Sequence, residues 1–112
     1  MNFAEDEMVL CGASCYTKKY YLNDNFENLP QSVKDELKIM CVIYTEEVSG
    51  TITLVFDGEG ELQVFVDHND DDFYYDEIGS ALKVKEMQRT KRELFEQLET
   101  YYKVVFLGEG LE

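Results

Sequence analysis

The residues best suited to chemistry are concentrated in one acidic segment, VDHNDDDFYYDEIG, at residues 66–79. It contains five aspartates, one glutamate, the only histidine of the chain and three adjacent aromatic residues. Read as an EF-hand loop, the segment supplies oxygen ligands at positions one, three and five, which are Asp67, Asn69 and Asp71. Position six, which requires glycine, is Asp72, and position twelve, which requires glutamate, is Ile78. The pattern therefore does not predict a dedicated calcium site, and carboxylate-bound calcium is kept only as an alternative.

The three cysteines and the histidine have the donor set of a Cys₃His zinc site. These residues are Cys11, Cys15, Cys41 and His68. Three residues separate the cysteines in CGASC, which is wider than the usual two-residue gap, and Cys41 lies on the apolar face of a predicted helix. A free cysteine on such a face behaves as a small buried hydrophobe. We therefore expect core thiols, with no structural disulfide, no metal and no cofactor, and zinc remains an alternative.

Catalytic constellations are not apparent in this sequence. Ser–His or Cys–His chemistry would require Ser80 or a cysteine to approach His68, and nothing in the spacing suggests this. The DGEG and LGEG segments resemble turns, because a phosphate-binding loop needs a following Lys-Ser/Thr. We predict that the protein is not an enzyme.

The elements that position these residues begin with two short strands, Met8–Ala13 and Lys18–Leu22, separated by a turn within Gly12–Thr17. Pro30 and the capping-box spacing of SVKD at residues 32–35 predict the start of a helix that ends at Gly50. Its apolar stripe has helical spacing and consists of Val33, Leu37, Met40, Cys41, Tyr44 and Val48. Ile39, Val42 and Ile43 widen the stripe and predict a helix that is covered on more than one side.

A hairpin, TITLVFDGEGELQVFV, follows this helix. Its register can be predicted, because a two-residue loop would place Leu54 opposite Gln63 and mix apolar with polar side chains on one face. Loops of three or five residues pair Leu54 with Leu62 or with Val64 and keep one face apolar. The loop is therefore expected to contain an odd number of residues.

The last pattern is a long helix from about Asp76 to Phe106, in which Lys91 interrupts the apolar seam. Its end, Tyr101–Leu107, could instead be a strand, because YYKVVF is rich in strand formers. The predicted fold is α+β, a small antiparallel sheet of two hairpins packed with two helices, in the order ββαββα. We expect a single domain over residues 1–112.

The charge of the chain is strongly negative and unevenly distributed. Its formal net charge is −14, and no lysine or arginine lies between Ile39 and Leu82. A basic segment follows, containing Lys83, Lys85, Arg89, Lys91 and Arg92. Direct nucleic-acid binding is not expected of so acidic a chain, because phosphate contacts need clustered basic side chains. The acidic N-terminus does not resemble a signal peptide, and no apolar run could span a membrane, so a cytoplasmic protein is expected.

Several blocks of the sequence resemble a known family. They are VLCGAS, KKYYLN, LPQSVKDELKIMCVIYTEEVSG, TLVFD, FYYDEIGSALKVK and LETYYKVVFLGE. From about Val9 to Glu109, the chain is similar to a family of small acidic proteins of anaerobic Gram-positive bacteria, a domain of unknown function. The resemblance implies a cytosolic bacterial protein and brings no catalytic or ligand residues.

These observations favour a non-enzymatic interaction protein that uses an acidic hairpin-and-loop face to bind a basic protein. A homodimer formed through the C-terminal helix is a further expectation. The alternatives are a nucleic-acid mimic, with carboxylates in two rows along one face, and a metal-binding protein. The predicted partner-binding residues are Glu59, Glu61, Asp67, Asp70, Asp71, Asp72, Tyr74, Tyr75 and Asp76.

Overall fold

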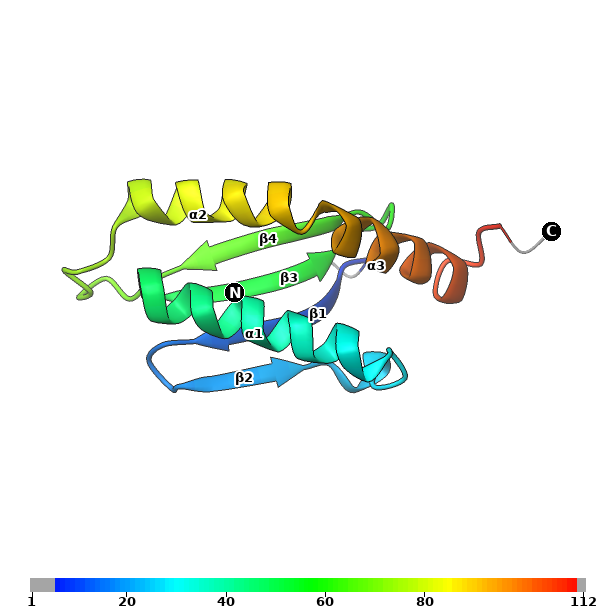
Figure 1. Cartoon of the computed structure of the whole chain (residues 1–112), viewed down its shortest axis with the longest axis horizontal. Helices are drawn as coiled ribbons and strands as arrows, with labels where there is room; N and C mark the ends of the chain where they lie inside the picture. The colour runs from blue at the N-terminus through cyan, green and yellow to red at the C-terminus, as the bar shows by residue number, and fades with distance from the viewer. Residues whose placement is uncertain (1–5, 111–112) are drawn as a thin grey trace.

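A computed structural model describes residues 6–110 of the chain. Its strands are β1 (Met8–Ser14), β2 (Lys19–Leu22), β3 (Thr51–Phe56) and β4 (Leu62–Asp67). They form one antiparallel sheet in the order β2-β1-β3-β4 (Figure 1). The helices are α1 (Gln31–Val48), α2 (Glu77–Thr90) and α3 (Arg92–Val105), with a short 3₁₀ helix, η1 (Asp24–Phe26). The α+β class and the two hairpins are confirmed, and the element order is ββαββαα.

The first hairpin is longer on its β1 side than the sequence predicted. Gly12, which the sequence placed both at the end of the predicted strand and in the possible turn, lies inside β1, where a Cβ atom would come within 2.9 Å of the Ile52 carbonyl oxygen. A bulge follows Val9 and shifts the register of β1 against β3. Asn23 supports the bulge, because its backbone N–H donates to the Leu10 carbonyl at 3.0 Å and its side-chain amide to that of Val9 at 2.7 Å.

The β3–β4 hairpin has the expected odd loop length. Leu54 pairs with Val64, which leaves five residues, 57–61, in the turn. The Asp57 carboxylate accepts hydrogen bonds from the backbone N–H groups of Glu59 and Glu61, at 2.9 and 3.0 Å. An aspartate that bonds neighbouring N–H groups in this way stabilises the turn locally.

Helix α1 lies across the sheet, in front of β1 and β3 (Figure 1). The helix begins directly after Pro30, and no side chain caps its N-terminus, so the SVKD capping box predicted from the sequence does not form. The predicted apolar stripe is buried against the sheet, apart from the half-buried Val33. The prediction of cover on a second side is wrong for Ile39 and Ile43, whose exposed fractions are 58% and 46%.

The C-terminal segment is two helices and not the single long helix expected from the sequence. Lys91 separates them with φ −106° and ψ 23°, outside the helical region. The break redirects the chain, so that Leu94, Phe95, Leu98 and Tyr102 of α3 are buried in the core. A straight helix over the predicted span would be about 45 Å long, more than twice the length of a six-residue strand. The region Tyr101–Val105 is helical, which resolves the choice left open between helix and strand.

An aromatic cluster joins α3 to the sheet and to η1. The ring of Phe56 stacks on that of Tyr102 at a centroid distance of 4.2 Å, and Phe26 lies 5.6 Å from Phe56. Phe106 lies 5.0 Å from Tyr102 and 5.1 Å from Phe26. Offset or tilted aromatic pairs at these distances add to the stability supplied by burial alone.

Candidate functional site

The predicted partner-binding residues fall into two groups at opposite ends of β4. Glu59 and Glu61 lie in the β3–β4 turn, whereas Asp67 ends β4 and the other six lie in the loop between β4 and α2, residues 68–76. The intervening strand of six residues is about 20 Å long. Figure 1 shows the β4–α2 loop projecting at one end of the molecule, away from the β3–β4 turn. The nine residues therefore do not form one continuous face.

The β4–α2 loop is fastened to the body of the protein at Asp72. Its carboxylate accepts hydrogen bonds from the Tyr16 hydroxyl at 2.6 Å and from the Ser49 hydroxyl at 2.7 Å. The Tyr16 hydroxyl also accepts a hydrogen bond from the backbone N–H of Asn69 at 3.0 Å. These donors favour the charged carboxylate, so they lower the pKa of Asp72. Asp72, which the sequence presented as a partner-binding residue, thus has a structural role in this loop.

A second attachment joins the loop to both helices through Tyr75. The Tyr75 hydroxyl donates to Ser80 Oγ at 2.7 Å, and the Tyr44 hydroxyl lies 2.6 Å from the same atom. The imidazole of His68 stacks on the Tyr75 ring at 4.1 Å and lies 3.8 Å from Glu77. Burial raises the pKa of Tyr44 to about 12. The Ser80 hydroxyl is thus held between two tyrosines, whereas the His68 ring contacts Tyr75 and Glu77.

The remaining residues of the loop project into solvent. The side chains of Phe73 and Tyr74 are 90% and 94% exposed, and Ile78 at the start of α2 is 75% exposed. The carboxylates of Asp70 and Asp71 are exposed and make no hydrogen bond or ion pair within residues 6–110. A group of exposed, large apolar side chains indicates an interaction surface, whereas single exposed apolar residues are common on any protein. The prediction of partner-binding residues did not include Phe73 or Ile78. Phe73 could have been included, because it is the first of three adjacent aromatic residues that follow an acidic run.

Of the other predicted acidic residues, Asp76 and Glu61 have partners within the protein, and Glu59 lies at the β3–β4 turn. Asp76 is the N-cap of α2, where its carboxylate accepts a hydrogen bond from the Gly79 N–H at 2.9 Å. Glu61 forms an ion pair with Lys103 of α3 at 3.2 Å. Glu59 is exposed at the β3–β4 turn.

The four residues of the hypothetical zinc site are distributed over separate places. Cys11 and Cys41 are fully buried, with their sulfur atoms 4.0 Å apart. The hydrogen bond between these thiols and their burial raise the pKa of Cys41. Cys15 Sγ instead accepts a hydrogen bond from the Gly50 N–H at 3.0 Å, and His68 belongs to the loop. Within residues 6–110, no group of three or more His, Cys, Asp or Glu side chains is placed to hold a metal ion.

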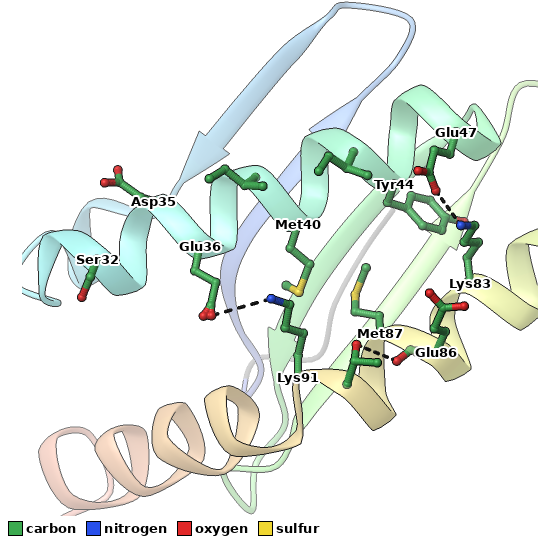
Figure 2. Close-up of a pocket in the computed structure, with 13 residues that line it drawn as sticks. Ser32, Asp35, Glu36, Met40, Tyr44, Glu47, Lys83, Glu86, Met87 and Lys91 are labelled. Carbon is green, nitrogen blue, oxygen red and sulfur yellow. Dashed lines mark hydrogen bonds and ion pairs between the residues drawn. The ribbon is translucent and has the colours of Figure 1, made fainter.

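A groove between α1 and α2 is a concave surface separate from the loop. It encloses about 620 Å³, and Met40 and Met87 lie at its floor. Figure 2 shows two ion pairs from α1 across the groove, one from Glu47 to Lys83 of α2 at 2.6 Å and one from Glu36 to Lys91, the residue between α2 and α3, at 3.8 Å. No pattern in the sequence predicts this groove, because the groove depends on the break at Lys91 and on the separation of two helices.

The fold and these surfaces define a two-layer α+β protein with a projecting acidic and aromatic loop. Residues 7–110 match the model of a family described as a family of unknown function (DUF6145), and the chain belongs to this family. The match confirms the expectation of a domain of unknown function. No curated protein and no solved structure matched the chain. None of the helices in the described part is long and apolar enough to cross a bilayer.

Proposed function

We propose that the protein is a non-enzymatic interaction module of the bacterial cytoplasm that binds a basic protein through its β4–α2 loop. The observation that carries this proposal is the nearly complete exposure of Phe73 and Tyr74 beside the carboxylates of Asp70 and Asp71. Aromatic side chains are enriched among the residues that dominate binding energy at protein interfaces. Carboxylates beside them attract a basic partner and increase its rate of association.

The attachment of the loop supports the same function. The loop is fixed at Asp72 and Tyr75 by hydrogen bonds to side chains of other elements. A loop held in this way loses less conformational entropy when its partner binds. The exposed residues Phe73 and Tyr74 therefore lie in a loop whose backbone is held in place by Asp72 and Tyr75.

The loop favours protein binding over the alternative of nucleic-acid mimicry. A phosphate mimic requires carboxylates in two rows along one face, whereas the nine predicted residues lie at two ends of β4. Exposed aromatic side chains between the carboxylates have no counterpart in such rows. The interaction module is therefore the function that we carry forward.

The proposal is tested by affinity capture from the native cell with matched variants. The test variant combines Phe73→Ser and Tyr74→Ser, which are exposed enough to be replaced without disturbing the core. The control is Glu59→Gln, which removes one charge at the opposite end of β4. We expect the wild-type protein and the control to retain a basic protein that the loop variant loses, and we expect the association rate to fall as salt rises.

Retention of the same proteins by the loop variant, or an association rate insensitive to salt, would count against the proposal. Light scattering on the same samples reports the mass of the complex. It also tests the separate expectation of a homodimer formed through the C-terminal helices.

A further inference from the structure

The groove between α1 and α2 has an apolar wall that no element within residues 6–110 covers. Ile39 and Ile43 lie one turn apart on α1 with exposed fractions of 58% and 46%, beside the buried Met40 and Met87. A solvent-facing helix surface would ordinarily carry polar residues at these positions. Methionine adapts its shape to different partners, so a floor of two methionines suits a surface that accepts another side chain.

The shape of the groove suits an α-helix. The pairing of Glu36 with Lys91 and of Glu47 with Lys83 shows that α1 and α2 run antiparallel along the groove (Figure 2). The two glutamates are eleven positions apart on α1, which corresponds to about 16 Å, or three helical turns. A third helix can place one residue per turn against Ile39 and Ile43. Helical walls offer no free backbone edge to which an extended strand could pair.

The charges around the groove select the kind of helix. Four carboxylates and two lysines line it, a net charge of 2 − 4 = −2, in a chain whose net charge is −14. Glu36 and Glu47 are paired with the lysines, whereas Asp35 and Glu86 form no ion pair within residues 6–110. An acidic helix would be repelled here, and a helix flanked by lysine or arginine would be attracted.

We propose that this groove binds an amphipathic, cationic α-helix of a partner protein. Its apolar face would pack on Ile39, Ile43, Met40 and Met87, and its basic residues would lie beside Asp35 and Glu86. No residue of the β4–α2 loop lines the groove, so this surface is additional to the proposed loop interface and does not depend on it.

The proposal is tested with a fluorescently labelled peptide of about 18 residues, long enough to populate a helix. The peptide carries leucine at helical spacing and lysine and arginine on its flanks. Two further peptides serve as comparisons, one with the same composition in scrambled order and one with glutamate in place of the basic residues. Fluorescence anisotropy should show the first peptide binding at least about tenfold more tightly than either comparison.

Variants of the full chain identify the surface. Ile39→Ser combined with Ile43→Ser should weaken binding by about tenfold or more, because both apolar contacts are lost. Leu82→Ser, which alters an exposed leucine of α2 outside the groove, is the matched control and should leave binding unchanged. Glu86→Lys, a surface change that leaves the apolar wall intact, should weaken binding of the cationic peptide and strengthen that of the acidic one.

Equal binding of the scrambled peptide, or affinity unaffected by both the isoleucine and the Glu86 variants, would overturn the proposal. So would a wild-type dimer that becomes a monomer in the isoleucine variant, because a second copy would then occupy the groove. Phe73→Ser with Tyr74→Ser should leave peptide binding unchanged, so failure of the groove and failure of the loop are distinguished.

Discussion

Asp72 illustrates how one residue in a charged run acquires a role that its neighbours lack. Its sequence context is that of Asp70 and Asp71, yet only Asp72 meets the hydroxyls of Tyr16 and Ser49. The partner residues are separated from it by 56 and 23 positions, so local sequence cannot reveal the contact. That Asp70 and Asp71 are exposed could be expected from the acidic run itself, whereas the hydrogen bonds of Asp72 depend on the tertiary fold.

The Tyr16–Asp72 hydrogen bond leads to a prediction about pH. Tyr16→Phe removes the donor that contributes most to lowering the pKa of Asp72, so that pKa should rise toward its ordinary value of 3.8. Because the pKa in the folded state is lowered, the stabilisation is fully present above the ordinary pKa and is lost as pH falls through the lowered one. The difference in unfolding free energy between wild type and variant should therefore be larger at pH 7 than at the acid limit, where only the loss of the Asn69 N–H hydrogen bond to Tyr16 remains.

NMR titration of the Asp72 side-chain carboxyl measures the pKa, and denaturant unfolding at several pH values measures the stability difference. Tyr21→Phe provides the control, since it makes the same chemical change at an exposed tyrosine of β2. An unchanged pKa of Asp72 in the Tyr16 variant would show that this hydrogen bond does not govern its ionisation.

At the scale of elements, α2 differs from the other two helices in how little of it is buried. Only Ser80 and Met87 are buried in α2, whereas α1 buries six residues and α3 four. The position of α2 therefore depends on specific links, namely the Tyr44–Ser80–Tyr75 hydrogen bonds and the two ion pairs across the groove. Exposed ion pairs contribute little stability, so the hydrogen-bonded serine carries more of this attachment.

Ser80→Ala is accordingly expected to destabilise the protein out of proportion to its size. The substitution leaves the hydroxyls of Tyr44 and Tyr75 without their shared partner, and the free energy of unfolding should fall by about 1–3 kcal/mol. Chemical denaturation measures this change, with Ser32→Ala at the exposed start of α1 as the control. Equal stability of the Ser80 variant and the wild type would mean that water replaces the lost contacts at no cost.

The elements were largely predictable from periodicity, and the exceptions have physical reasons. Alternation of apolar residues in β3 and β4 limited the hairpin to an odd loop, but only the turn chemistry of Asp57 and Gly60 distinguishes five residues from three. The predicted C-terminal helix continued through Lys91, although Lys91 interrupts its apolar seam, because lysine is a good helix former. The break there is imposed by the need to bury α3 beside Phe26 and Phe56, which local sequence does not record.

For the candidate site, the sequence identified the acidic and aromatic loop but not its geometry. The charge run after β4 indicated an acidic surface, and Tyr74 proved to be exposed as an interface residue should be. The predicted hairpin already placed Glu59 and Glu61 at its turn and Asp67 at the far end of its second strand, but grouping the residues by charge alone treated them as one face. The groove is formed by two helices that are distant in the sequence, so local sequence patterns could not predict it.

On the scale of the whole molecule, the dominant property is a net charge of −14 on a body whose longest dimension is 52 Å. The Debye length is about 30 Å at 0.01 M salt and about 8 Å at 0.15 M. At low salt, the two acidic ends of the β3–β4 hairpin therefore repel each other, whereas at physiological salt each end interacts only with its own neighbours. Net charge this far from zero destabilises a compact state through self-repulsion.

We therefore expect the melting temperature to rise when ionic strength is increased from about 0.01 M to about 0.15 M. The opposing effect is the screening of ion pairs such as Glu47–Lys83, which is small because exposed pairs contribute at most about 1 kcal/mol each. Calorimetry in sodium chloride measures the change, and a variant with Asp70→Asn and Asp71→Asn should show a smaller rise because two repelling charges are removed. A melting temperature that falls over this range would mean that attraction within the ion pairs outweighs the repulsion among the excess carboxylates.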